Sequence, residues 1–177
     1  MCARVAKAVA SVEKDEVSRS MYSGRFFDMM SRGDFLPNSP ILMNFGQPGA
    51  LGSACFVLPI EDDMHGIYQT LKDTAIVQKA GGGTGYNFSN LRPFGAKVGS
   101  YGQSSGVVSF ISVYNESGMA INQGGRRRSA SMAMLDVSHP ELIKFIRAKE
   151  EDGKLSNFNL SVAITDQFMD SVITDPD

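Results

Sequence analysis

The sequence predicts an α/β fold, and three observations lead to that prediction. Two segments repeat apolar residues at steps of three and four, the spacing of helices that bury one face. Four shorter apolar segments are typical of strands, and the last of them alternates apolar with polar side chains. These helices and strands follow one another in mixed order, which is compatible with part of a barrel.

The first element expected is helical and covers about residues 3–33. Gly33 is a typical stop signal, because glycine ends many helices. Apolar anchors come shortly before that stop, at Phe26, Phe27, Met29 and Met30.

Two amphipathic helices are expected further along the chain. The first spans about residues 63–80; Asp62 or Asp63 can cap its start, and Gly81 suits its end. The second spans about residues 106–120. Their apolar stripes are Met64, Ile67, Leu71 and Ala75 in the first helix, and Val107, Phe110, Ile111, Val113 and Tyr114 in the second.

A shorter helix is expected near residue 140. Ser138 and Glu141 have the spacing of a capping box, and Pro140 suits the first turn of a helix that reaches about residue 149. The four strands are expected at residues 55–59, 86–90, 130–136 and 158–164.

Composition and charge argue against several classes of protein. The 177 residues are 42% apolar and 20% charged, as in a soluble globular domain, and a net charge of -2 gives no basic field that would favour DNA. No apolar run approaches the roughly 20 residues that span a bilayer, and the N-terminus has no signal-peptide core. Two distant cysteines, Cys2 and Cys55, make neither a disulfide framework nor a metal site. We therefore expect a cytoplasmic protein with no DNA or membrane partner.

Four short motifs occur in a fixed order along the chain. They are Leu36-Pro-Asn-Ser-Pro40, Gly52-Ser-Ala-Cys-Phe56, Lys79-Ala-Gly-Gly-Gly-Thr-Gly85 and Asn122-Gln-Gly-Gly-Arg-Arg-Arg-Ser129. Each is ambiguous alone, but together they resemble the large catalytic chain of ribonucleotide reductases, and in particular its adenosylcobalamin-dependent branch, class II. The resemblance covers nearly the whole chain.

The resemblance implies a ten-stranded α/β barrel preceded by helices. Residues 1–33 would be the N-terminal helical segment, and residues 34–177 the front part of an incomplete barrel. The Asn-Pro-Cys-x-Glu sequence that holds the radical cysteine and the catalytic glutamate in this family does not occur here. We therefore expect the isolated chain to be inactive and to need a missing C-terminal portion or a complementing chain.

The resemblance also implies the chemistry of the complete enzyme. It would reduce ribonucleotides to deoxyribonucleotides by radical chemistry, with adenosylcobalamin as the cofactor that starts the radical. The implied partners are a ribonucleotide substrate, a deoxynucleoside triphosphate effector, a thioredoxin-type reductant and a second copy of the chain.

Cys55 is the one catalytic residue that the resemblance implies. On its own, a cysteine between Ala54 and Phe56 is most often a small core residue. In the resemblance it matches the first of two cysteines that reduce the substrate, form a disulfide and are reduced again by an external dithiol. Cys2 precedes the matched region, so the second thiol is expected outside this chain.

The glycine run at residues 81–85 fits neither the phosphate-loop pattern nor the dinucleotide fingerprint. A helix cap followed by a tight turn explains part of it, and the extra glycines suggest close approach of a ligand to the backbone. In the resemblance, Gly83 matches a glycine whose main chain contacts the substrate, and Ser39 a residue that contacts its phosphate. Ala54 stands where class I enzymes usually have serine, so any contact there would be through the backbone.

Three residues match positions of the family's effector site. Asp62 matches an acid that accepts a hydrogen bond from ribose or base, and Arg92 an arginine that holds phosphate oxygens. Lys79 is a weaker candidate for the same phosphates. The alternatives are a helix cap for Asp62 and a surface ion pair for Arg92.

Two further segments resemble the loops that link the effector to the substrate. Residues 99–106, rich in glycine and serine, match the first specificity loop, and residues 123–130 match the second. In the second loop, Gln123 and Arg127 would reach bases or phosphates. A phosphorylation site at Ser129 or a nuclear-localisation patch are the competing interpretations.

His65 and His139 have no partners at metal-ligand spacing, so we expect surface or capping roles for both. Three other functions remain open at this stage: a class I large chain, a noncatalytic module that binds deoxynucleotides, and a structural α/β domain whose glycine-rich turns bind nothing.

Overall fold

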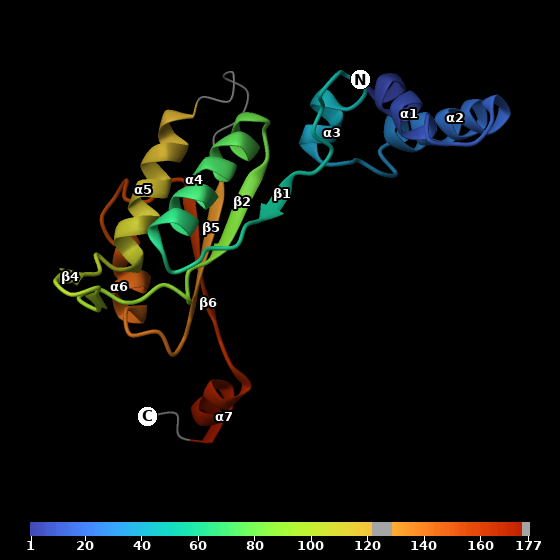
Figure 1. Ribbon diagram of the computed structural model, residues 1–177. Helices are drawn as coiled ribbons and strands as arrows, with labels where there is room; N and C mark the ends of the chain where they lie inside the picture. The colour runs from blue at the N-terminus through green and yellow to red at the C-terminus, as the bar shows by residue number, and fades with distance from the viewer. Residues whose placement is uncertain (122–128, 175–177) are drawn as a thin grey trace. The chain divides into compact units, whose positions relative to one another are not determined.

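The computed structural model describes residues 1–121 and 129–174 (Figure 1). It contains two compact units. The first comprises Met1–Cys55 with Ala80–Gly82, and the second comprises Phe56–Lys79 with Gly83–Asp177. The predicted division into residues 1–33 and 34–177 stays a prediction.

The first unit contains three helices, α1 (Cys2–Ala10), α2 (Glu16–Arg32) and α3 (Ser39–Asn44). The prediction of one helix over residues 3–33 is therefore wrong. Asp15 is extended, and its side chain accepts a hydrogen bond from the amide of Ser18, so it begins a new helix. The predicted stop is confirmed, because Gly33 caps α2 in the left-handed conformation, with φ of 79°.

The core of the first unit is small. Val5, Ala6 and Met30 are its buried apolar residues, where α1 packs against α2. Arg4 extends this contact to α3, because its guanidinium donates hydrogen bonds to the carbonyls of Leu42, Met43 and Phe45. A cation at the end of a helix also interacts favourably with the helix dipole.

The second unit is built on a sheet of four strands in the order β1-β2-β5-β6. Strands β2 and β5 are parallel, and so are β5 and β6. Their bounds are β1 (Cys55–Val57), β2 (Gly83–Asn87), β5 (Ser131–Asp136) and β6 (Phe158–Ala163). The α/β fold class is confirmed. Three of the strands lie where they were predicted, whereas β2 begins inside the glycine run, because Thr84 and Gly85 pair with Ser131 and Met132.

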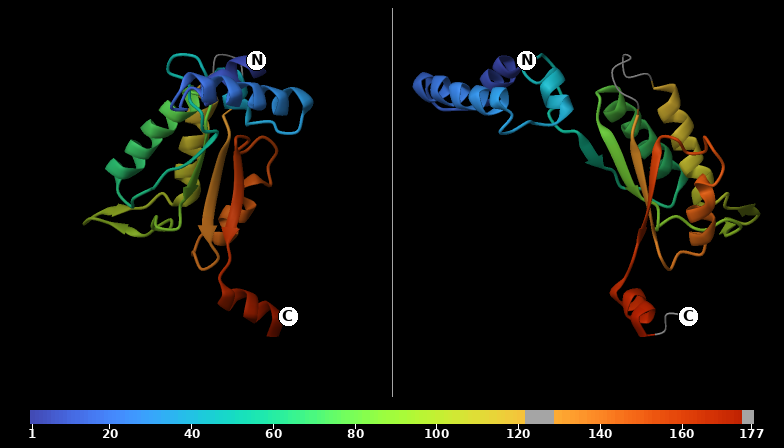
Figure 2. Two further views of the ribbon diagram at one scale, coloured as in Figure 1. Left: turned by 90° about the vertical axis from the view of Figure 1, so that its right-hand side faces the viewer. Right: turned by 180° about the vertical axis from the view of Figure 1, so that it is seen from behind.

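Helices cover one face of this sheet, where α4 (Met64–Lys79) and α5 (Val107–Ala120) lie side by side (Figures 1 and 2). Both helices were predicted. Helix α6 (Leu142–Ile146) packs next to α5 and β5 and continues into a 3-10 turn at Arg147–Lys149. Three short elements of the second unit were not predicted: the hairpin strands β3 (Lys97–Val98) and β4 (Gly102–Gln103), and helix α7 (Asp166–Thr174).

Aromatic side chains form the centre of the core between these helices and the sheet. Tyr86 and Tyr114 meet edge to face with ring centroids 5.2 Å apart, and Phe88, Phe145 and Phe158 are equally buried. Both tyrosine hydroxyls are hydrogen-bonded: Tyr114 donates to the carbonyl of Ile67, and Tyr86 donates to Thr84. Burial raises the pKa of both tyrosines above the ordinary value.

Within residues 1–121 and 129–174, no helix has the length and apolar character needed to cross a membrane. The same residues contain no cluster of three or more potential metal ligands.

Candidate functional site

Asp62 and Arg92, two of the predicted effector residues, bind each other. The Nε of Arg92 lies 2.7 Å from Oδ2 of Asp62, and the backbone amide of Arg92 donates to Oδ1 at 3.1 Å. Both side chains are about one-third exposed, at 37% for Arg92 and 32% for Asp62. The Asp62 carboxylate therefore orients the guanidinium from one side.

The local fold explains why these two residues meet. Asp62 precedes α4, and Arg92 follows β2 after a turn that Phe88 and Leu91 anchor in the core. Asp63, not Asp62, caps α4, because its Oδ1 accepts a hydrogen bond from the amide of Gly66. The helix-cap alternative for Asp62 is thus wrong, whereas the ion pair considered for Arg92 is present.

A cavity of about 320 Å³ lies next to this ion pair. One wall comes from the start of α4, and another from the β3–β4 hairpin and the residues that follow it. Residues that line it include Asp62, Asp63, Ile67, Arg92, Gln103 and Ser104. Arg92 uses three of its N–H donors on Asp62 and on the carbonyl of Lys97. Since a guanidinium has five N–H donors, two remain for a ligand.

The segment predicted as the first specificity loop, residues 99–106, has a defined structure at this cavity. It contains strand β4, which pairs with β3 through Lys97 and Gln103. Gly99 and Gly106 have φ of 58° and 83°, a backbone conformation that glycine adopts without strain. The segment therefore shapes one wall of the cavity.

Lys79 does not join this group. It ends α4, whereas Asp62 lies just before that helix begins. A helix of 16 residues is about 24 Å long, so the two residues lie at opposite ends of α4. A role for Lys79 with the effector's phosphates stays a prediction.

The predicted substrate residues divide between the two units. Ser39, Ala54 and Cys55 belong to the first unit and Gly83 to the second. Cys55 is an exposed free thiol at the start of β1, and Ala54 next to it is half-buried. Gly83 is buried at the start of β2, so this part of the glycine run is a strand, in contrast to the predicted turn.

Ser39 is exposed in the first turn of α3. The side chain of Asn38 caps that helix by accepting a hydrogen bond from the amide of Ile41. Pro40 also lies in the first turn, a position that needs no amide donor. These contacts place the Ser39 hydroxyl near the beginning of a short helix.

Gln123 and Arg127, the candidates in the second specificity loop, lie outside the described residues. Ser129 follows that segment and is buried, with its hydroxyl donating to the carbonyl of Gly118. Phosphorylation of Ser129 would require this hydroxyl to leave its partner.

Sequence reasoning missed Glu141 and His139. The predicted capping box is wrong, because the Glu141 side chain makes no cap bond to α6. Instead its carboxylate accepts a hydrogen bond from the amide of Val107, at the start of α5. His139 is buried, so the expected surface role is wrong, although its Nδ1 does accept from the amide of Glu141. The spacing of Ser138 and Glu141 concealed a contact to a helix that is distant in the sequence.

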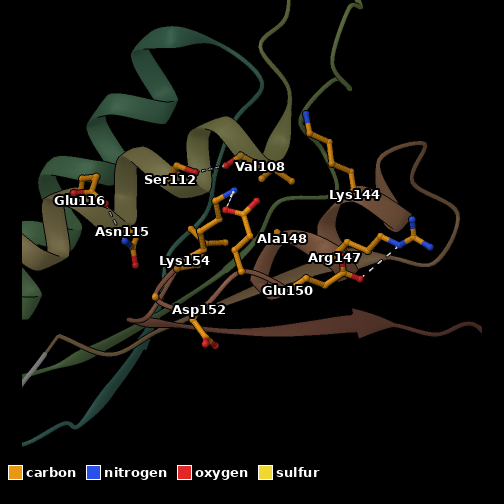
Figure 3. Close-up of a pocket in the computed structure, with 13 residues that line it drawn as sticks. Val108, Ser112, Asn115, Glu116, Lys144, Arg147, Ala148, Glu150, Asp152 and Lys154 are labelled. Carbon is orange, nitrogen blue, oxygen red and sulfur yellow. Dashed lines mark hydrogen bonds and ion pairs between the residues drawn. The ribbon is translucent and has the colours of Figure 1, made fainter.

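A second cavity, of about 740 Å³, lies between α5, α6 and the turn that follows α6 (Figure 3). Its charged side chains largely satisfy one another. Arg147 lies 3.7 Å from Glu150, and Lys154 lies 2.7 Å from Glu151. Because these ions are exposed and paired, this cavity has less to offer an anionic ligand than the cavity at Arg92.

Two family models match the chain. One is described as "Ribonucleotide reductase, barrel domain" and matches residues 53–177. The other is described as "Ribonucleotide reductase, all-alpha domain" and matches residues 1–50. The chain belongs to the ribonucleotide reductase family. The predicted reductase resemblance is therefore confirmed.

Curated relatives distinguish two branches of ribonucleotide reductases. Proteins named vitamin B12-dependent ribonucleoside-diphosphate reductase are 46% identical over 93% of this chain in Thermoplasma acidophilum and 47% identical over 96% in Mycobacterium tuberculosis. The ribonucleoside-diphosphate reductase subunit alpha of Chlamydia muridarum is 32% identical over 85% of the chain. The predicted resemblance to the class II branch is thus confirmed over the class I alternative.

This chain spans only part of these ribonucleotide reductases. It covers 22% of the Thermoplasma protein, 24% of the Mycobacterium protein and 14% of the Chlamydia protein. The activity, substrates and partners of a complete reductase are therefore proposals for this chain, not properties that it inherits.

Proposed function

We propose that this chain is the front part of a ribonucleotide reductase and that it supplies one redox cysteine, part of the substrate site and the specificity-effector site. The observation that carries the proposal is the Arg92 guanidinium, which Asp62 orients beside a cavity. The relatives' printed names support ribonucleoside diphosphates as substrates of the complete enzyme and oxidation–reduction as its chemistry.

The effector would be a deoxynucleoside triphosphate bound at Arg92. Two N–H donors that Arg92 does not use on residues 1–121 and 129–174 would hold phosphate oxygens by charge-assisted hydrogen bonds. Asp62 would hold the guanidinium in one orientation, so less side-chain freedom is lost when the ligand binds. Polar groups of Gln103 and Ser104 on the cavity wall are available for the sugar or base.

The substrate would be reduced by Cys55 together with a second thiol that this chain does not provide. Two thiols and one ribose C–OH give a C–H bond, a disulfide and a water molecule, so electrons and atoms balance. A thioredoxin-type dithiol would then reduce the disulfide by exchange, which requires an approachable sulfur. The exposed position of Cys55 suits such exchange. Ser39 would contact the substrate phosphate, and Ala54 and Gly83 would contribute backbone groups.

The names of the relatives imply a cobalamin cofactor for the complete enzyme. When bound, this cofactor supplies the first radical. His139 does not fit a role as its ligand, because both ring nitrogens are within hydrogen-bond distance of backbone atoms. No residue of this chain is assigned to the cofactor. Cytoplasmic location and pairing with a second copy also remain proposals.

Calorimetric titration of the complete protein tests the effector site. Arg92→Met keeps much of the apolar stem and removes the charge and the donors. We expect it to weaken deoxynucleoside triphosphate binding about 10- to 100-fold, because hydrogen bonds to charged groups are lost. Arg147→Met is the matched control, since Arg147 is an exposed arginine paired with Glu150 in the second cavity. Binding by Arg92→Met within twofold of wild type contradicts the proposal.

A product assay separates the reductase from a noncatalytic module. The Asp62–Arg92 pair and its cavity form entirely within the second unit, without Cys55. That independence keeps a noncatalytic deoxynucleotide-binding module as the second candidate. Deoxyribonucleotide formed by the complete protein with adenosylcobalamin and a dithiol supports the reductase, whereas effector binding without product supports the module.

A further inference from the structure

The Glu141 carboxylate lies at the base of the β3–β4 hairpin, against backbone amides that are distant from it in the sequence. Its side chain is buried, with only 6% of the residue exposed. The same oxygen, Oε2, accepts hydrogen bonds from the amide of Phe94 at 3.0 Å and from the amide of Val107 at 2.7 Å. Phe94 precedes the hairpin and Val107 follows it, so one carboxylate oxygen joins the two ends of that segment.

Lys144 contacts this carboxylate, and Gly106 leaves space for it. The Nζ of Lys144 lies 3.4 Å from Oε1 of Glu141 and 4.8 Å from the centre of the Phe94 ring, so it bridges the carboxylate and the hairpin. A Cβ atom at Gly106 would lie 2.6 Å from each carboxylate oxygen. Only glycine fits there, because such a distance is shorter than any normal contact and φ is 83°.

His139 fixes the backbone on the N-terminal side of Arg92. Its Nδ1 accepts a hydrogen bond from the amide of Glu141 at 3.1 Å, and its Nε2 lies 2.9 Å from the carbonyl oxygen of Leu91. Since an amide can only donate and a carbonyl can only accept, the proton is on Nε2. Leu91 directly precedes Arg92, so the segment 139–141 fixes the backbone on both sides of the arginine.

Ser104 continues these contacts into the cavity wall. Its hydroxyl donates to the carbonyl of Arg92 and accepts from the amide of Gly106. Ser104 is itself part of the lining of the cavity. Glu141 and Ser104 therefore bind the adjacent amides of Val107 and Gly106, and Ser104 connects this point to the backbone of Arg92, the residue expected to bind phosphate.

We propose that Glu141 is a positioning residue for the effector cavity: by holding both ends of segment 94–107, it sets the distance between the hairpin wall and Arg92. The inference rests on the proposed effector site and goes beyond it, because Glu141 is not among the residues that line the cavity. A buried carboxylate that accepts two backbone amides is costly to replace, which makes its effect measurable.

Glu141→Gln in the complete protein tests the proposal. The glutamine can place its one carbonyl oxygen where Oε2 accepts both amides, but that oxygen is neutral, so both charge-assisted hydrogen bonds weaken, and its NH2 group then faces Lys144. We expect the dissociation constant for the effector to rise about tenfold, as for the loss of one hydrogen bond to a charged group. Hydrogen exchange at the amides of Phe94 and Val107 should become faster at the same time.

Glu150→Gln is the matched control. It makes the same chemical change at an exposed carboxylate whose partner is Arg147, and effector affinity should not change. A Glu141→Gln protein that melts earlier but binds the effector within twofold of wild type would show a purely structural role and would overturn the inference.

Lys144→Met provides a second variant if Glu141→Gln does not fold, because Lys144 contacts Glu141 and the Phe94 ring but does not line the cavity. It removes the bridge between the carboxylate and the hairpin, and we expect about threefold weaker binding, as for the loss of one ion pair. Unchanged affinity in that variant overturns the inference. Arg92→Met distinguishes the two proposals: if it binds normally, the effector site is wrong, whereas if it alone weakens binding, only the role of Glu141 is wrong.

Discussion

Arg92 and Cys55 are held in very different ways. Arg92 has contacts from Asp62, Lys97 and Ser104, and its neighbours in sequence are anchored in the aromatic core. Cys55 is an exposed free thiol at the start of a three-residue strand. The difference suggests that recognition of an effector relies on a prebuilt site within this chain. Redox chemistry requires a sulfur that other groups can reach.

Replacing the thiol should have the largest effect and sharpen this contrast. Cys55→Ser in the complete protein removes the electron donor but keeps the size of the side chain. We expect turnover with an external dithiol to fall by roughly a thousandfold or more, while effector affinity stays the same. Cys2→Ser is the control and should retain activity. Deoxyribonucleotide analysis by chromatography measures both variants, and substantial turnover by Cys55→Ser would remove the redox role.

Removing a large side chain from the core should have the second-largest effect, because it destabilises the region around Arg92. Phe88 is completely buried and lies four positions before Arg92. Phe88→Ala should lower the free energy of the opening reaction that exposes the β2 and β5 amides to exchange. We expect a decrease of about 3–5 kcal/mol, because contacts are lost and a cavity is left behind. Tyr101→Ala, at a fully exposed site, should change it by less than about 0.5 kcal/mol. Native-state hydrogen exchange measures both, and equal effects would show that the core does not support this region.

Raising the pH should have the smallest of these effects on stability. The effect should be absent near neutrality and should come only from the buried tyrosines of the core. Burial raises the pKa of Tyr86 and Tyr114 in the folded protein, whereas a tyrosine in the unfolded chain has a pKa of about 10. A raised folded pKa means that stability is fully present below about pH 10 and is lost as the pH increases further.

Ultraviolet titration of phenolate can check this order. The absorbance of Tyr86→Phe and Tyr114→Phe variants should match wild type up to about pH 10. The phenolate absorbance of the tyrosine that each variant lacks should appear in the wild type only at the higher pH at which the protein unfolds. Tyr101→Phe is the control, because Tyr101 is fully exposed and lies outside the aromatic core. Early titration of either core tyrosine would show that the aromatic cluster is open to water.

Periodic segments allowed the sequence to predict most of the fold. Helices α4 and α5 were recognised because their apolar stripes repeat over several turns. The break between α1 and α2 was missed, because Asp15 begins a helix through a local cap that interrupts an otherwise helical stretch. Helices α3 and α7 were missed because they are short, and the glycine run hid the start of β2.

Residues of the candidate site could be predicted only where they match a family motif and also have a side chain suited to the expected role. Asp62 and Arg92 were recognised by resemblance, and the structure brings them together. An ion pair was an open alternative for Arg92, but Asp62 was not predicted to be its partner. Glu141 could not have been assigned, because its partner Val107 lies 34 residues away. Sequence spacing describes neighbours along a helix, whereas this contact depends on how α5 and α6 pack.

The hydroxyl groups beneath the glycine run also determine how two strands align. Thr84 of β2 lies opposite Ser131 of β5, and both hydroxyls bond with the side chain of Gln78 from α4. Since side chains alternate between the faces of a sheet, a slip by one residue would turn either hydroxyl away from Gln78, leaving a glycine in place of Thr84, or Ala130 or Met132 in place of Ser131. A misaligned sheet would thus bury unsatisfied polar groups, so this small network selects the native strand alignment during folding.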